Sequence, residues 1–266
     1  MSQTFDQLRA LAQDDPNILA FWLGGSRGKG FATEHSDHDC LMIVADAALG
    51  DYRQRFQQVS QSDLDCVVST LDQLRAYAEW GGPEAWDRYS FAHVRVDIDK
   101  TGEVQALIDA KACVPAEARF GFIDASLDHY VNQLYRSLKN LRDGRPIAAR
   151  LEAAEQVQPL LNALFALHDG RLRPFHKYLQ WELETYPLDR LPWASDVFLE
   201  KLPAILDSAD PDLQREIFRK IETLFRSSGH DAIFDAWGVA LPFIRADQYN
   251  SSSPPGAAKP RNAGDP

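Results

Sequence analysis

The sequence predicts an α+β protein, in which a sheet with flanking helices is followed by an all-helical domain. Two observations predict this class. Short apolar runs alternate with helical patterns over the first hundred residues, whereas beyond about residue 120 nearly all of the apolar periodicity is helical. From residue 249 onward the composition is that of a linker, rich in Ser, Pro and Gly. We therefore expect domains at residues 1–115 and 116–248, and a disordered tail at residues 249–266.

The N-terminal elements follow from local patterns. Phe5, Leu8 and Leu11 recur at helical spacing, and Asp15-Pro16 ends that helix. Apolar runs bounded by turn residues predict strands at residues 18–23, 40–44, 66–68 and 94–99. Between the third and fourth strands, residues 71–80 have a helical pattern.

The second part of the chain has the spacing of amphipathic helices. One is marked by Leu127, Tyr130, Leu134 and Leu138, a second spans residues 151–167, and a third spans residues 213–225. Strand signals are nearly absent there, so this part is predicted to be a bundle of helices.

Charge and composition restrict the classes of partner. The chain has 28 Lys and Arg against 39 Asp and Glu, for a formal net charge of −11, which argues against binding nucleic acid over a broad surface. No apolar run approaches the roughly 18–20 residues of a membrane helix, and the first residues lack the features of a secretory signal. Three widely spaced cysteines, Cys40, Cys66 and Cys113, form no CxxC pair, which excludes a zinc ribbon or a disulfide framework. We expect a cytoplasmic protein with no membrane partner.

The most informative segment is a glycine-rich turn after the first strand. Residues 24–30 read Gly-Gly-Ser-Arg-Gly-Lys-Gly, and Ser36-Asp37-His38-Asp39 follows. A Walker A loop is excluded because Leu23 stands where its first glycine belongs and Lys29 is followed by Gly30. A dinucleotide fingerprint is excluded as well, because its third glycine is absent.

The remaining pattern is suited to phosphate and metal binding. Glycines let the backbone approach a phosphate, successive N–H groups can surround an anion, and the Ser26 hydroxyl can donate to the same oxygens. Residues i and i+2 of a strand share a face, so Asp37 and Asp39 are expected side by side. Two adjacent carboxylates repel one another unless a cation lies between them, and Mg²⁺ prefers carboxylates together with phosphate oxygens.

A third carboxylate would complete a two-metal site. Asp97 is the preferred candidate, because a carboxylate between Val96 and Ile98 in an apolar strand needs a partner. Asp99 shares its face but opens a turn, where Asp is common, and Asp65 is a weaker candidate at the start of the third strand.

These motifs resemble those of the nucleotidyltransferase superfamily, and among its branches those of the aminoglycoside and lincosamide nucleotidyltransferases. The resemblance covers about residues 18–99. It rests on Gly25-Ser26 after the first strand, on Ser36-Asp37-x-Asp39 opening the second, and on residues 95–98, Arg-Val-Asp-Ile, in a later strand. A weaker similarity covers residues 171–179. The resemblance implies a nucleotidyltransferase-type mixed sheet followed by a helical substrate-binding domain.

The activity that the resemblance implies is transfer of a nucleoside monophosphate, AMP from ATP, to a hydroxyl of a small acceptor, with release of pyrophosphate. In such enzymes the Gly25-Ser26 turn holds the triphosphate, and Asp37 and Asp39 bind Mg²⁺, with two ions expected. The later carboxylate, here Asp97, completes the site and can help deprotonate the acceptor hydroxyl.

Several further residues are candidates for substrate contact. Arg27, Lys29 and Lys177 could add positive charge at the triphosphate. Glu182 and Glu184, which follow Trp181, could bind a cationic acceptor such as an aminoglycoside or lincosamide antibiotic, a function in antibiotic resistance. Many relatives form dimers that share a cleft, so a homodimer stays open.

Three other functions compete with this one. The first is a protein-modifying nucleotidyltransferase that acts as a regulator or antitoxin on a protein partner, although the long helical half favours a self-contained enzyme. The second is an RNA-tailing polymerase, against which the net charge speaks. The third is an inactive binding module, against which the three carboxylates speak.

Overall fold

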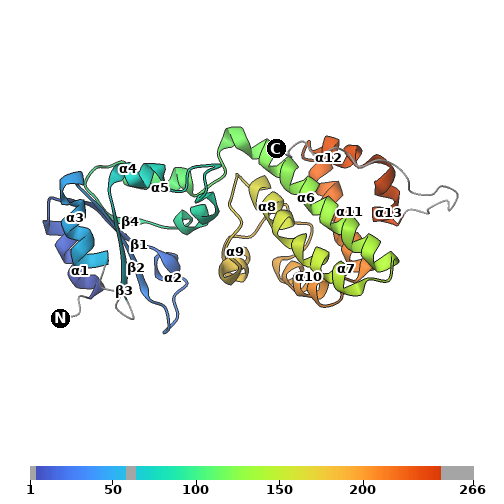
Figure 1. Cartoon of the computed structure of the whole chain (residues 1–266), viewed down its shortest axis with the longest axis horizontal. Coiled ribbons are helices and arrows are strands. Elements are labelled where there is room, and N and C mark those ends of the chain that lie inside the picture. The colour runs from blue at the N-terminus through green and yellow to red at the C-terminus, as the bar shows by residue number, and fades with distance from the viewer. Residues whose placement is uncertain (1–3, 58–63, 247–266) are drawn as a thin grey trace.

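A computed structural model describes residues 4–57 and 64–246. The sheet with its helices forms one part of the molecule and a helical assembly forms the other, with α9 between them (Figure 1). The segment 249–266, for which we predicted disorder, lies outside the described residues.

The sheet has four strands in the order β3-β2-β1-β4. Their bounds are Ile18–Leu23 for β1, His38–Val44 for β2, Leu64–Ser69 for β3 and Val96–Asp99 for β4. β1 is antiparallel to both β2 and β4, whereas β2 and β3 are parallel. The sheet is therefore mixed, and the predicted α+β class is confirmed.

Helices cover both faces of this sheet, and two separate cores result. Phe21 belongs to the core beneath α1, whereas its neighbour Trp22 belongs to the core beneath α4 and α5. Because successive side chains of a strand point to opposite faces, a strand that is buried on both sides reads as a continuous apolar run. The bounds on the first face are Phe5–Asp14 for α1, Asp46–Ala48 for η1, Leu49–Tyr52 for α3 and Arg53–Gln57 for the π-helical turn η2. On the second face they are Leu71–Ala76 for α4, Ala85–Phe91 for the 3₁₀ helix η3 and Val104–Lys111 for α5.

The second part is helical and is built around the long helix α6, Ala116–Arg142. The other helices are α7 Pro146–Glu155, α8 Val157–Leu167, α9 Leu179–Thr185, α10 Ser195–Ser208, α11 Pro211–Arg226, α12 Asp231–Ala236 and α13 Leu241–Arg245. Two short 3₁₀ helices complete it, η4 His176–Tyr178 and η5 Gly238–Ala240. One continuous apolar core joins α6 to α13, whereas Tyr178 of η4 packs in a separate cluster with Tyr89 and Ala92.

The structure divides the helix predicted at residues 151–167 into α7 and α8. The break falls at Gln156, three residues before Pro159. Proline lacks the N–H that would bond to the carbonyl of Glu155, and its ring crowds that carbonyl, so a single straight helix is disfavoured there.

None of the described helices is both long enough and apolar enough to cross a bilayer.

Candidate functional site

The turn that follows β1 is pressed against the start of β2. It forms the short helix α2, Gly25–Gly28, and the N–H of Gly24 donates to the carbonyl of Asp39 over 2.7 Å. Gly25 has a φ of +54°, and a Cβ built on it would lie 1.7 Å from Oδ2 of Asp39. Only glycine fits here, because a side chain would occupy the space of the Asp39 carboxylate.

We expect Gly25→Ala to lower catalytic activity strongly, with a loss of stability no larger than that of a matched control variant. The methyl group forces the Asp39 carboxylate out of its position, and the left-handed backbone adds about 1–2 kcal/mol of strain. Gly30→Ala is the matched control, since Gly30 has a φ of +73° but no atom within 4 Å of its Cβ position. Both variants should lose similar stability in denaturant titrations, while only Gly25→Ala loses about a hundredfold or more in kcat/KM. Equal activity of the two variants would contradict this placement of Asp39.

Asp39 and Asp65 lie side by side on two parallel strands. They are register partners of β2 and β3, whose backbones are about 4.8 Å apart. Burial raises the pKa of the Asp39 carboxyl, and the nearby charges of Asp37 and Asp65 raise it further. Asp37 precedes β2 by one residue and is exposed. The N-terminal ends of β2 and β3 therefore gather acidic side chains that repel one another.

Asp97 is not brought to this cluster. It lies on β4, and β1 separates β4 from β2, so about 10 Å lies between the two backbones across the sheet. The register between β4 and β1 shifts by one residue at Asp97, and the side chain of Asp97 is exposed. The weaker sequence candidate, Asp65, lies opposite Asp39 instead.

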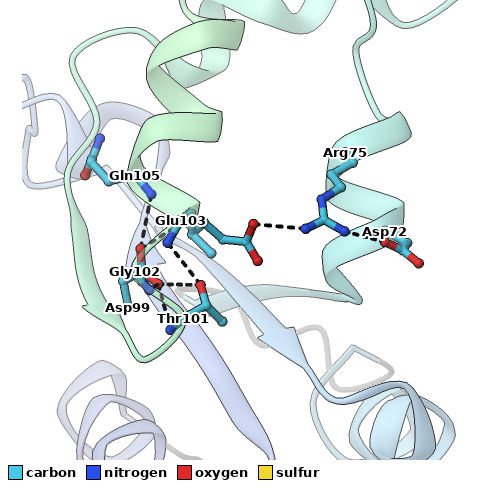
Figure 2. Close-up of polar contacts among 8 residues, drawn as sticks. Asp72, Arg75, Asp99, Thr101, Gly102, Glu103 and Gln105 are labelled. Carbon is cyan, nitrogen blue, oxygen red and sulfur yellow. Dashed lines mark hydrogen bonds and ion pairs between the residues drawn. The ribbon is translucent and has the colours of Figure 1, made fainter.

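Asp99 has a structural role. Its Oδ1 accepts hydrogen bonds from the N–H and hydroxyl of Thr101 and from the N–H of Gly102, and its Oδ2 accepts from the first N–H groups of α5 (Figure 2). Burial raises the pKa of this carboxyl, but these hydrogen bonds outweigh burial and lower it. Asp99 thus closes the turn into α5, as expected for Asp in a turn. In the same view, Arg75 bridges Asp72 of α4 and Glu103.

Lys177 reaches the glycine–serine turn from the helical part. Its Nζ lies 3.4 Å from Oγ of Ser26, and the hydroxyl of Tyr178 lies 3.1 Å from the same Oγ. Residues about 150 positions apart therefore meet at the Ser26 hydroxyl. The sequence indicated Lys177 through its place after Pro174-Phe175. Tyr178 lies in the segment 171–179 of weaker similarity but was not singled out as a site residue.

Arg27 and Lys29 contact the protein's own backbone. Arg27 donates to the carbonyls of Ser36 and Asp37, which holds the loop before β2. Lys29 is 6% exposed, and its Nζ donates to the carbonyls of Tyr89, Ser90 and Ala92.

Burial lowers the pKa of Lys29 to about 8, although Glu182 and Asp87 raise it in part. Its ammonium group thus joins the glycine-rich turn to η3 from the inside. Arg27 and Lys29 thus position the turn, and Lys29 also lines the neighbouring cavity, whereas their contact with a triphosphate stays a prediction.

A cavity of about 500 Å³ adjoins the acidic cluster. Asp39 and Asp65 line it from the sheet, and Phe175, Lys177 and Tyr178 line it from the helical part. The remaining lining combines apolar and aromatic side chains with polar ones, among them Lys29 and Asp87. Its size is that of pockets that hold small organic ligands.

Glu182 does not line this cavity. It is 1% exposed and accepts hydrogen bonds from Tyr89 over 2.6 Å, from Arg171 over 2.7 Å and from His93 over 3.0 Å. Burial raises the pKa of its carboxyl, but the hydrogen bonds from His93, Tyr89 and Arg171 lower it overall. Glu184 is exposed on α9 and accepts from Gln180. The structure therefore brings neither glutamate to the cavity as an acceptor ligand.

The acidic cluster fits a metal that arrives with a substrate. In the described ranges, no three His, Cys, Asp or Glu side chains are grouped closely enough to hold a metal ion by themselves. Mg²⁺, however, is usually held by one or two carboxylates together with waters and substrate phosphates. The repulsion felt by the Asp39 carboxyl is the kind that such a cation relieves.

Comparisons with known proteins give little beyond this geometry. No protein-family model matches the chain, and no curated protein matches it. Among solved structures, a nucleotidyltransferase-like protein from Exiguobacterium sibiricum 255-15 is similar to 89% of this chain and 74% of its own, with 12% identity and a TM-score of 0.40. A likeness this distant carries no argument about activity.

Proposed function

We propose that this protein is a nucleotidyltransferase that moves AMP from ATP to a hydroxyl of a small acceptor and releases pyrophosphate. One observation carries the proposal. Asp39 and Asp65 lie opposite one another, beside a glycine–serine turn that only glycine can form at residue 25, and Lys177 lies beside Ser26. The spacing of turn and carboxylates is also the pattern that resembles the nucleotidyltransferase superfamily.

In this proposal both parts of the chain contact the triphosphate. The Ser26 hydroxyl and the free N–H groups at the start of α2 donate to phosphate oxygens, and Lys177 neutralises part of their charge. Asp37 and Asp39 hold Mg²⁺, which when bound supplies charge neutralisation at the phosphates.

The transfer also needs a base near the hydroxyl of the acceptor molecule. The hydroxyl oxygen forms a bond to the α-phosphorus, the bond from that phosphorus to the bridging oxygen breaks, and pyrophosphate leaves. Asp65 lines the cavity and takes the hydroxyl proton, the role first considered for Asp97. The cavity holds the acceptor in line for attack.

A small acceptor suits the cavity better than a protein partner does. A volume of about 500 Å³, enclosed by both parts of the chain, matches a molecule of drug size. The resemblance suggests an aminoglycoside or lincosamide antibiotic, so these belong in any panel of acceptors.

The test is transfer of label from ATP. The purified chain, Mg²⁺ and α-labelled ATP are incubated with hydroxyl-bearing acceptors, and labelled product and pyrophosphate are measured, with EDTA as the control for metal dependence. We expect label to move only when metal and acceptor are both present. ATP that neither binds nor is consumed with any acceptor contradicts the proposal.

We expect Lys177→Met to raise the KM for ATP about 10- to 100-fold, because a charged hydrogen bond to phosphate is lost. Lys220→Met is the matched control, since Lys220 is an exposed lysine of α11 that does not line the cavity. Steady-state kinetics at varied ATP compare the two variants. Equal KM values would show that Lys177 does not contact the nucleotide.

A further inference from the structure

The cavity has a second polar end, and Arg53 lies there. β3 runs along the cavity from Asp65 to Ser69, a span of about 13 Å. Arg53, the first residue of η2, lines the cavity near Ser69. Its Nε donates to the carbonyl of Val68 over 3.0 Å, and its Nη2 donates to Oε1 of Gln73 over 2.9 Å. The guanidinium is thus held in one place, away from Asp39 and Asp65.

The groups around Arg53 are hydrogen-bond donors. Oε1 of Gln73 accepts from both Arg53 and the N–H of Thr70, so the amide NH₂ of Gln73 is left as a donor. Ser69 adds a hydroxyl to the cavity lining. A donor cluster of Arg53, Ser69 and Gln73 therefore lies at this end.

The charge of this donor cluster is unbalanced. Among the ion pairs formed within residues 4–57 and 64–246, none includes Arg53. Two of its five N–H groups are used by Val68 and Gln73, which leaves three for a ligand. A planar guanidinium with free N–H groups matches the geometry of a carboxylate or a phosphate.

We infer that the donor cluster binds an anionic group, carboxylate or phosphate, of the acceptor. This inference rests on the proposed function, which places the reacting hydroxyl at Asp65. Between the two ends, the apolar side chains of Val67 and Leu74 and the ring of Tyr77 contact the body of the ligand. The acceptor is then a hydroxy acid or hydroxy phosphate with an apolar or aromatic body, which differs from the polycationic aminoglycosides that the resemblance suggests.

The test compares probes that share a hydroxyphenyl body and differ in charge. 4-Hydroxyphenylacetate carries a carboxylate, 4-hydroxybenzylphosphonate resembles a phosphate, and tyramine carries an ammonium group. Isothermal titration measures each against the full chain, with and without Mg²⁺ and ATP. We expect at least one acid to bind about tenfold or more tightly than tyramine, and the tighter acid identifies the preferred anion.

Arg53→Met should abolish this preference, and Arg55→Met should keep it. Arg55 belongs to the same turn but stacks on the rings of Tyr52 and Phe56 and does not line the cavity. Arg53→Lys retains the charge but lacks the planar, paired N–H groups of the guanidinium, and it should show an intermediate preference. It replaces Arg53→Met in the test if the Met variant is unstable. Affinity for ATP should be equal in all variants.

Two results overturn the inference: no preference of the wild-type chain for either acid, or a preference that survives in both Arg53 variants. Failure of the proposed function has a different signature. A chain that binds an acid through Arg53 but never binds ATP refutes the transfer reaction and leaves the anion subsite standing.

Discussion

Asp65→Asn is expected to lower kcat for nucleotide transfer by about 10²- to 10⁴-fold, whereas Asp97→Asn should leave kcat within about threefold of the wild-type value. The reason is the order of the strands. Asp65 is the register partner of Asp39 and lines the cavity, whereas Asp97 lies beyond β1 on β4. Both substitutions remove one negative charge from an exposed strand residue, so each is a control for the other.

The measurement is the single-turnover rate at saturating ATP, with thermal unfolding recorded for both variants. Asp39→Asn, included as a reference, should be at least as inactive as Asp65→Asn. A large loss in Asp97→Asn combined with normal activity in Asp65→Asn would restore the assignment first made from the sequence and would contradict the proton-accepting role of Asp65.

Glu182→Ala is expected to destabilise the protein by about 3–5 kcal/mol, because it leaves the buried hydroxyl of Tyr89 and the half-buried guanidinium of Arg171 without their acceptor. Glu184→Ala is the matched control two residues further along α9, where the side chain is exposed, and should change stability by less than about 0.5 kcal/mol. Urea titrations monitored by circular dichroism compare the two variants.

A double replacement separates the charge from the packing. Glu182→Leu combined with Arg171→Met removes both charges of the pair and should recover part of the lost stability. Loss of less than about 1 kcal/mol in Glu182→Ala would mean that the hydrogen bonds to Glu182 contribute little to stability.

The stability that Glu182 contributes should also depend on pH. Its folded-state pKa lies below the ordinary carboxyl value, because the hydrogen bonds from His93, Tyr89 and Arg171 outweigh burial. Its contribution is therefore fully present above that ordinary value and is lost as the pH falls through the lowered one.

Much of the N-terminal fold could be predicted from local patterns. Residues 18–23 were predicted as a strand, and β1 has the same bounds. The helix that Asp15-Pro16 was expected to end does end there, at Asp14. Some helix ends and some whole helices could not be predicted from local patterns. The helix predicted at residues 71–80 ends at Ala76, and α5 and α10 were not predicted. The domain boundary at residue 115 stays a prediction.

The residues of the candidate site also differ in how well the sequence predicts them. The glycine–serine turn and Asp39 could be identified because both flank one loop, and their contact is a short-range one. Lys177 could only be suggested, since its contact with Ser26 joins residues 151 positions apart. Glu182 was predicted to contact a cationic acceptor because it follows Trp181, whereas the fold buries it against Arg171, Tyr89 and His93.

By itself, the sequence determined the positions of the four strands and of the most strongly periodic helices, and it determined that a glycine–serine turn precedes a pair of carboxylates. These features depend on periodicity, on glycine geometry and on close neighbours along the chain. Only the tertiary structure decided which distant acid joins Asp39. That choice depends on strand order, because β3 pairs with β2 while β4 pairs with β1, and pairing between strands is a contact between segments that no local pattern encodes.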